Sequence, residues 1–360
     1  MPDKSIKLIK KLSNANGISG FENEVLDVAK NETAANLNFE QDAMQNLYLY
    51  TKNYNSDKPT VMLDSHSDEV GFMVKSINKN GSLKFVTIGN WAPQNIPAHK
   101  VRIKNRYGNY VKGIVASTPP HFLSQAEREQ LLPVEKLIID LGSTSYQQTI
   151  DNYGIEVGAP IIPDVEFEYD DSNQIMIGKA FDNRLGTAIV IELMLYFANQ
   201  NLDFNLVGSL SAQEEVGTRG AEVTARKIRP DLALVFEGTP ADDNFRDHYD
   251  SQSALNKGPQ IRHRDISIIS NPALVKFAKN SARLNKIPFQ EAVRIGGGND
   301  GARILLSNYS VPTAVLGVPV RYAHTHYCIS SLPDYKNTIK WAKSILTDLS
   351  SAQLKQFNYI

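Results

Sequence analysis

Two helices are predicted near the start of the chain. Apolar residues between positions 6 and 12 recur with helical spacing, and this stripe ends near Asn16-Gly17. Ser19 and Glu22 then stand three residues apart ahead of a second apolar stripe, which is the pattern of a capping box. The chain is therefore expected to begin with a helix, a turn and a capped second helix.

Short apolar runs between helical stripes predict a sheet. Residues 60–63 form a run typical of a strand buried on both faces, and an abrupt polar cluster at 64–69 follows it. After Gly178, strand and helix patterns alternate again. The predicted elements there are a helix after Asp182, strands at 205–210, 232–236 and 311–318, and helices that begin at Asn271 and Ser331. This alternation favours an α/β fold.

The middle of the chain has a different character, because short strands dominate it and long helical stripes are scarce. Asn80-Gly81 lies between two apolar runs, which predicts a hairpin. Further short strands are predicted at 101–103, 110–111, 113–116 and 137–141. We therefore expect a β-rich domain at residues 71–163, inserted between two parts of an α/β domain at 1–70 and 164–360.

Polar residues gather where the predicted strands end. His66 and Asp68 follow one strand, Glu214-Glu215 follows another, and Glu237 ends a third, while Asp182 and His324 lie in turns. Ligands of open α/β sheets bind outside the carboxyl ends of the strands. These separated clusters therefore predict one shared site.

The residue types in these clusters suit a pair of divalent cations. Two histidines and three carboxylates favour Zn²⁺, Co²⁺ or Mn²⁺. Three carboxylates and one bridging hydroxide would neutralise two such ions, so the site could be buried without a large desolvation cost. Asp68 lies two residues from His66 and can orient its ring. Of the adjacent Glu214 and Glu215, one could bind metal while the other handles the proton of an attacking water.

Each of these clusters also has an ordinary explanation. A His-x-Asp sequence is often a solvated polar turn, and a Glu-Glu pair is often a solvated face of a helix. Asp182 could cap the helix that follows it, and Glu237-Gly238 could be a simple turn. The combination of all five clusters at strand ends is what favours a site.

Composition and charge exclude several classes of protein. Hydrophobic residues make up 42% and charged residues 21%, which is typical of a globular chain. The net charge of −1 gives no general reason to bind nucleic acid, and no apolar stretch is long enough to span a membrane. The single cysteine and the absence of an apolar signal segment lead us to expect a cytoplasmic protein.

Seven motifs together resemble the glutamyl aminopeptidase and tetrahedral aminopeptidase family of dinuclear metallopeptidases, some members of which carry cellulase labels. They are LSNANGISGFE at 12–22, HSDEVG at 66–71, PPH at 119–121, AFDNR at 180–184, QEEVG at 213–217, GGGND at 296–300 and RYAH at 321–324. The resemblance covers nearly the whole chain. It implies a mixed sheet flanked by helices, with an inserted β-barrel domain, and assembly into a homododecamer.

The resemblance also implies a role for each site residue. His66 and Glu237 would bind one metal ion, Glu215 and His324 the other, and Asp182 would bridge the two. Glu214 would be the general base, and Asp68 would orient His66. The implied reaction is removal of N-terminal residues from peptides by metal-activated water, with two Zn or Co ions, or Mn, in each subunit.

Three positions depart from the family pattern. Glu237 stands where Asp is more common, so its longer side chain would shift or chelate the first metal ion. His326 follows the last ligand where relatives have proline, and it could compete as a ligand, line the pocket or simply pack. Asn299 stands where Thr is common, and we find no functional consequence of this change.

Specificity is the least determined part of the prediction. An acidic substrate residue needs a cation in its pocket, and basic residues follow Glu237 at Arg246, His248, Arg262, His263 and Arg264. A solvated loop would show the same residues. We expect a preference for Glu or Asp, with a leucyl or broad-specificity aminopeptidase as the alternative. A carboxypeptidase or deacylase on the same scaffold, and a non-catalytic binding protein, are further alternatives.

Overall fold

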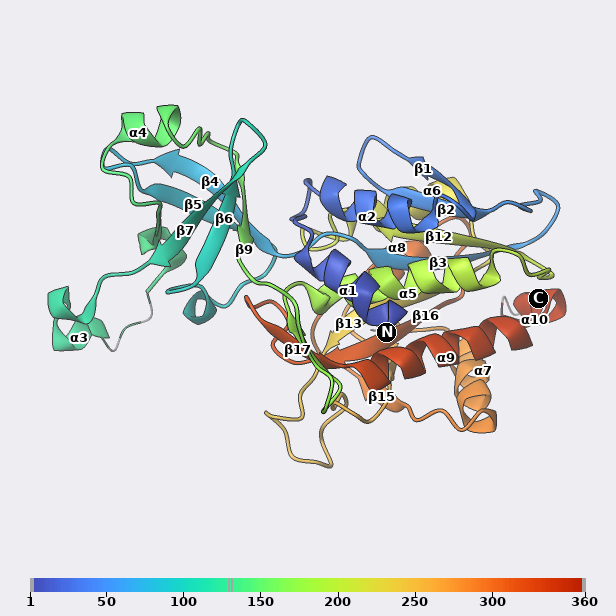
Figure 1. Cartoon of the computed structure of the whole chain (residues 1–360). Coiled ribbons are helices and arrows are strands. Elements are labelled where there is room, and N and C mark those ends of the chain that lie inside the picture. Colours follow the sequence, from blue (N-terminus) through green and yellow to red (C-terminus); the bar gives the residue numbers. More distant parts are fainter. Residues whose placement is uncertain (1–2, 129, 131, 358–360) are drawn as a thin grey trace.

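The computed structural model describes residues 3–128, 130 and 132–357. In Figure 1 a larger α/β body lies beside a smaller β-barrel, and the segment around α3 (Gln125–Arg128) extends away from both. No helix in this described part is both long and apolar enough to cross a bilayer.

A mixed, eight-stranded sheet forms the centre of the larger body, in the order β1-β2-β12-β3-β13-β16-β14-β15. Its central strands β12, β3, β13 and β16 are parallel to one another. The strands are β1 (Leu37–Gln41), β2 (Leu47–Thr51), β3 (Thr60–His66), β12 (Asn205–Ser211), β13 (Leu232–Pro240), β14 (Gln260–Arg264), β15 (Gln290–Val293) and β16 (Thr313–Val320). A smaller sheet contains β10 (Glu168–Asp170), β11 (Ile175–Gly178) and β17 (Cys328–Ser331).

Helices cover both faces of this sheet (Figure 1). The apolar cluster on one face includes residues of α1 (Lys4–Asn14), α2 (Asn23–Thr33), α5 (Phe181–Phe197), α7 (Pro272–Leu284), α9 (Leu332–Asp348) and α10 (Ser351–Phe357). The cluster on the other face includes residues of α6 (Arg219–Ile228) and α8 (Gly301–Leu305). Within β3, Val61 and Leu63 belong to the first cluster and Met62 to the second. Successive side chains point to opposite faces, which explains why the strand is a continuous apolar run.

The smaller part is a closed barrel with the strand order β4-β5-β8-β7-β6-β9 and an apolar core of its own. Its strands are β4 (Gly71–Ile77), β5 (Leu83–Ile88), β6 (Lys100–Lys104), β7 (Tyr110–Ala116), β8 (Ile138–Asp140) and β9 (Pro160–Pro163). The connections contain α4 (Tyr146–Asp151), η1 (Pro93–Asn95), η2 (Pro120–Phe122) and η3 (Val134–Lys136) in addition to α3.

The predicted fold class, a mixed sheet flanked by helices with a β-barrel, is confirmed. Strands β4 and β5 flank Asn80-Gly81, as the hairpin pattern predicts. The predicted capping box is wrong, because α2 begins at Asn23 and the Ser19 hydroxyl donates to Asp68 at 2.6 Å and accepts from no amide of α2. Division of the chain into domains at residues 70 and 163 stays a prediction.

Candidate active site

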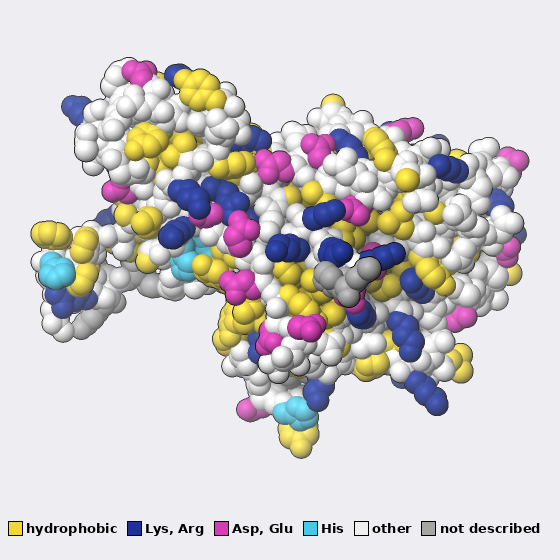
Figure 2. Space-filling view, in the orientation of Figure 1, with side chains coloured by type: hydrophobic (Ala, Val, Ile, Leu, Met, Phe, Trp, Pro, Cys, Tyr) yellow, Lys and Arg dark blue, Asp and Glu magenta, His cyan; other side chains and the backbone are white. Residues whose placement is uncertain are grey.

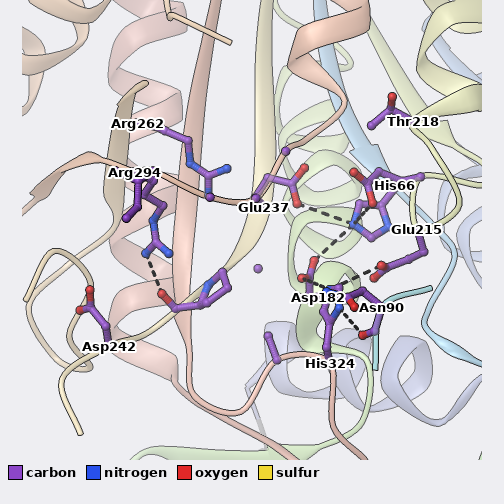
Figure 3. A pocket seen from close by; sticks show the side chains of 18 of the residues that line it. His66, Asn90, Asp182, Glu215, Thr218, Glu237, Asp242, Arg262, Arg294 and His324 are labelled. Carbon is purple, nitrogen blue, oxygen red and sulfur yellow. Dashed lines mark hydrogen bonds and ion pairs between the residues drawn. The ribbon is translucent and has the colours of Figure 1, made fainter. Parts of the chain in front are cut away.

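The predicted site residues lie close together at the carboxyl ends of the parallel strands. Figure 3 shows five of them, which are His66, Asp182, Glu215, Glu237 and His324. His66 is the last residue of β3 and Glu237 belongs to β13, while Glu214-Glu215 follows β12. Asp182 lies in the first turn of α5, and His324 lies in the connection between β16 and β17. The sheet therefore brings five sequence-distant segments to one edge, as the strand-end pattern predicts.

Two glycines allow α5 to approach β13 closely enough to place Asp182 beside Glu237. A Cβ at Gly186 would lie 2.6 Å from the Phe236 carbonyl oxygen, and a Cβ at Gly238 would lie 2.7 Å from the Cα of Asp182. Both positions therefore exclude a side chain.

Asn183 fixes this junction, because it uses both ends of its amide there. Its Nδ2 donates to the Phe236 carbonyl oxygen at 2.8 Å and to Glu237 Oε2 at 3.0 Å. Its Oδ1 accepts from the Gly238 amide at 3.0 Å. A fully buried amide with every contact satisfied holds Glu237 in one orientation.

Three of the predicted ligands form a first group around His66. His66 Nε2 lies 3.2 Å from Asp182 Oδ1 and 3.6 Å from Glu237 Oε2. The ligand atoms of these three residues all lie within 4.8 Å of one another, which is compact enough for one ion. Glu237 therefore belongs to this group, although its side chain is longer than that of the Asp that is more common at this position.

A second group shares Asp182 with the first. His324 Nε2 lies 3.6 Å from Asp182 Oδ2 and 3.4 Å from Glu215 Oε2. The other ring nitrogen of His324 lies 2.8 Å from the Asn90 carbonyl oxygen, on the segment that follows β5. Because the two oxygens of Asp182 face different histidines, this carboxylate lies between the two groups.

A third compact group combines His66 with Glu214 and Glu215. In that group Glu214 Oε2 lies 3.9 Å from His66 Nε2, farther than either Asp182 or Glu237. The geometry thus favours Glu214 as the free carboxylate, and its assignment as general base stays a prediction.

Asp68 contacts His66 and also the loop after β12. Its Oδ1 lies 3.4 Å from His66 Nδ1, and its backbone oxygen lies 3.2 Å from the same nitrogen. The carboxylate also accepts from the amides of Glu214 at 2.9 Å and Glu215 at 3.2 Å. The sequence suggested the first contact, whereas the second depends on the fold.

The carboxylates of the cluster repel one another in their buried setting. Burial raises the pKa of Glu214 to about 7, and the negative charges of Asp68 and Asp182 add to this effect. Burial likewise raises the pKa values of Glu215 and Glu237 well above their usual range. One oxygen of Glu237, Oε1, is buried with no hydrogen-bond partner among the described residues. A donor set of this kind fits divalent cations, which would compensate the crowded negative charge.

Asp182 differs from the glutamates, because two histidines face it. Burial alone would raise its pKa, but the contacts with His324 and His66 outweigh burial and hold the pKa well below its usual range. Asp182 is therefore more readily ionised than the three glutamates of the site.

A cavity of about 960 Å³ opens beside the cluster and is lined on its other side by basic residues. Arg246, Arg262 and Arg294 contribute to this lining, together with Asp242 and the glycines at 296–298. In Figure 3, Arg262 and Arg294 lie on the side of Glu237 away from His66. The cavity is therefore acidic at one end and basic at the other.

Hydrogen bonds hold the side chains of Arg262 and Arg294 in place. Arg262 donates to Thr239 Oγ1 at 2.7 Å and to Asp265 at 3.1 Å, and Arg294 donates to the Pro240 carbonyl oxygen at 2.7 Å. The Nε atoms of both arginines are buried without a hydrogen-bond partner among the described residues. Burial, and next the positive charge of Arg262, lowers the pKa of Arg294 to about 10.

Sequence reasoning missed Arg294 and Asn90, which lie in segments without a motif. Of the other predicted basic residues, Arg246 lines the cavity with a side chain that is 55% exposed. His248, His263 and Arg264 do not line it. His263 lies 2.7 Å from Glu291 instead.

His326 takes no part in the candidate metal groups of the described residues. Its ring is buried and stacks on His99 of the barrel, with 4.1 Å between ring centroids. Burial, and then the neighbouring His99, lowers the pKa of His326 to about 3, which keeps the ring neutral. Of the alternatives that the sequence left open, the structure favours packing.

Comparison with known proteins agrees with the motifs. A family model described as M42 glutamyl aminopeptidase matches residues 46–341. A glutamyl aminopeptidase of Lactococcus lactis subsp. cremoris is 30% identical over 354 residues, which cover 98% of each chain. A lysyl aminopeptidase of Pyrococcus furiosus is 29% identical, with 95% of this chain and 97% of that chain covered.

Solved structures share the fold over almost the full length. The crystal structure of a TET aminopeptidase from the marine sediment archaeon Thaumarchaeota archaeon SCGC AB-539-E09 matches with a TM-score of 0.93 and 34% identity, covering 99% of this chain and 100% of that one. The Pyrococcus horikoshii TET1 peptidase, described as able to assemble into a tetrahedron or a large octahedral shell, has the same fold at 24% identity. Its TM-score is 0.86, with 96% of this chain and 100% of that chain covered. The resemblance of the motifs is thus confirmed, and the chain belongs to the M42 glutamyl aminopeptidase family of peptide hydrolases.

Proposed function

We propose that the protein is a dinuclear metal-dependent aminopeptidase that removes acidic residues from the N-termini of peptides. The observation that carries the proposal is the pair of compact ligand groups that share Asp182. Each group supplies one histidine and one glutamate besides Asp182, which is a donor set suited to Zn²⁺, Co²⁺ or Mn²⁺.

His66, Glu237 and Asp182 would hold one ion, and Glu215, His324 and Asp182 the other. Bound there, the two cations would supply Lewis acidity, which lowers the pKa of water and polarises a peptide carbonyl. Asn183 and the Asn90 carbonyl support this arrangement, because they fix Glu237 and the ring of His324 through hydrogen bonds.

Glu214 is the group of this site that we assign to proton transfer. Its carboxylate would take a proton from the attacking water and give that proton to the nitrogen of the departing amine, so the peptide yields a carboxylate and an amine. Asp68 holds the backbone amide of Glu214 at 2.9 Å and so limits where this carboxylate can move.

The basic end of the cavity favours an acidic substrate side chain. The two guanidinium groups repel each other, because the positive charge of Arg262 adds to burial in lowering the pKa of Arg294. A carboxylate of Glu or Asp in the cavity would relieve this repulsion by pairing with the two guanidinium charges. The glutamyl specificity of the Lactococcus relative supports the same assignment.

The test compares kcat/KM for Glu-, Asp-, Leu- and Lys-p-nitroanilide in the wild type, Arg262→Met and Arg294→Met. We expect Glu to be preferred over Leu at least tenfold and this ratio to fall at least tenfold in both variants. Arg226→Met serves as the control, because Arg226 pairs with Glu222 on the surface of α6. A tenfold preference for Leu or Lys over Glu would refute the acidic specificity.

One other activity has specific support. The lysyl specificity of the Pyrococcus furiosus relative, together with Asp242 in the cavity lining, favours a basic preference as the second candidate. Hydrolysis of N-acylated amino acids in preference to the p-nitroanilides would instead identify a deacylase or carboxypeptidase on the same scaffold.

We further infer that the protein acts in the cytoplasm as a homo-oligomer, in the form of a dodecamer. The barrel exposes large apolar side chains that a partner subunit could cover, and Figure 2 shows hydrophobic side chains on this part of the surface. They include Tyr107, Ile114, Phe122, Tyr146 and Val157. The buried free thiol of Cys328 suits a reducing compartment. Light scattering of the intact protein that shows only monomer at micromolar concentration would refute the assembly.

A further inference from the structure

Three consecutive backbone amides in the loop after β12 face two buried carboxylates. The amides of Glu214 and Glu215 donate to Asp68, and the amide of Gln213 donates to Glu22 Oε1 at 3.2 Å. Glu22 thus extends to Gln213 the support that Asp68 gives to the next two residues. Glu22 comes from the N-terminal end of α2, 191 positions away from Gln213 in the sequence.

The side chain of Glu22 does not have the helix-capping role that the sequence pattern predicts for it. It occupies the N-cap of α2, but its side chain makes no capping hydrogen bond. The fully buried carboxylate instead accepts from the Gly20 amide at 2.8 Å and from the Gln213 amide, both through Oε1. Its second oxygen, Oε2, has no partner among the described residues. A buried acid of this kind is costly, so its position needs an explanation beyond helix capping.

The loop after β12 contains an unfavourable backbone conformation, which hydrogen bonds from elsewhere in the fold can stabilise. Gln213 has a φ of +56°, in the left-handed region that L-residues other than Asn and Asp seldom adopt. The loop then turns sharply, since the amides of Gly217 and Thr218 both donate to the Glu214 carbonyl oxygen. The direction of the Glu214 side chain therefore depends on how firmly the amides before it are held.

We propose that Glu22 is a positioning residue for Glu214, and this inference rests on the proposed role of Glu214 in proton transfer. Glu22 holds the entry to the loop and Asp68 holds its centre, so the two carboxylates together fix the backbone that carries Glu214 and Glu215. What matters in Glu22 is the reach of one acceptor oxygen and not its negative charge, because both hydrogen bonds go to Oε1.

A pair of substitutions separates reach from charge. Glu22→Gln keeps the length and an acceptor oxygen but removes the charge, whereas Glu22→Asp keeps the charge but is one methylene too short to contact both amides. Glu24→Asp is the matched control. Glu24 lies on the same turn of α2, and its carboxylate accepts from Tyr110 and from Asn16 instead of from the loop.

The measurements are kcat and KM with Glu-p-nitroanilide, metal content per subunit, and the melting temperature. In Glu22→Asp we expect kcat to fall at least tenfold, with KM within threefold of wild type and two metal ions retained. A displacement of about 1 Å can cost about 10²-fold in rate, so a fall of this size needs only a small shift of Glu214. Glu22→Gln and Glu24→Asp should keep kcat within threefold of wild type.

Several results would overturn the inference. Wild-type kcat in Glu22→Asp would show that the contact with Gln213 is not needed. An equal loss of kcat in Glu22→Gln would show that charge matters instead of reach, even if Glu22→Asp does not fold. An equal loss in Glu24→Asp would indicate general destabilisation. If wild-type protein with bound metal ions hydrolyses none of the substrates, or if Glu214→Gln is fully active, the proposed function itself fails.

Discussion

Replacing each of the adjacent glutamates in turn is the most direct test of how the site divides its work. Glu214→Gln and Glu215→Gln both preserve volume and remove one charge from a side chain that is mostly buried, 14% and 4% exposed respectively. Neither change touches the backbone amides that Asp68 holds. Any difference between the two variants therefore reports on the carboxylates themselves.

The structure gives different expectations for the two variants. Glu215 lies 3.4 Å from His324 and shares a ligand group with it, so Glu215→Gln should lower the metal content towards one ion per subunit. Glu214 Oε2 lies 3.9 Å from Nε2 of His66, so the substitution Glu214→Gln should leave both ions in place. Loss of a general base costs about 10²- to 10⁴-fold in kcat. That range corresponds to about 3 to 5 kcal/mol in the activation barrier.

The assay needs both activity and metal content from the same sample. Each variant is purified, loaded with Zn²⁺ or Co²⁺, dialysed and analysed for metal per subunit, and kcat is then measured with Glu-p-nitroanilide. Circular dichroism checks that the fold is retained. The expected pattern is two ions without activity for Glu214→Gln, and fewer ions with lower activity for Glu215→Gln.

A different outcome would refute specific parts of this reasoning. Normal turnover by Glu214→Gln would remove its role in proton transfer. Loss of metal by Glu214→Gln as severe as that of Glu215→Gln would show that the third compact group, His66 with both glutamates, is the one that binds metal.

Three further predictions concern stability. Lys179→Met should lower the free energy of unfolding by about 3 kcal/mol, because it removes one of two cations that pair with the buried Glu69; a guanidinium titration within 1 kcal/mol of wild type would contradict this. His326→Phe should keep the melting temperature and the metal content, whereas His326→Ala should cost about 2 to 4 kcal/mol through the cavity it leaves; loss of metal in the Phe variant would instead make the ring a ligand. Burial, and then Asp68, raises the pKa of Glu22 from 4.5 to about 7, so folded Glu22 retains its proton where the unfolded chain loses it. The free energy of unfolding of metal-free Glu22→Gln should therefore rise relative to that of the wild type between pH 4.5 and about 7, by about 3 kcal/mol. Urea titrations that give a constant difference across this range would rule out the pKa shift.

The sequence predicted best where neighbouring residues decide the outcome. The caps at Asn271 and Ser331 form as expected, because each side chain accepts from an amide three residues ahead. The buried strand at 60–63 could also be predicted, since burial on both faces leaves a continuous apolar run. Ser19 does not cap α2, because the helix begins only at Asn23, and the Ser19 hydroxyl instead donates to Asp68, 49 residues away.

The identity of the candidate ligands was also available from the sequence, because each ligand stands at a strand end or in a turn beside one. The sequence did not show which of these residues contact one another. His324 and His326 lie two residues apart in one loop, yet the first faces Asp182 and the second stacks on His99. Only the position of the barrel beside this loop separates the two roles.

The sequence by itself determined which residue types meet at the edge of the sheet, because periodicity and local capping place strands, and parallel strands share their carboxyl ends. The tertiary structure alone decided how these residues pair. Asp182 lies between two histidines because Gly186 and Gly238 let α5 approach β13, and Arg294 reaches the cavity from a segment without a motif. Glu22 supports Gln213 from 191 residues away. Contacts of this kind depend on how segments that are distant in the sequence pack against one another, and local sequence patterns carry no information about that packing.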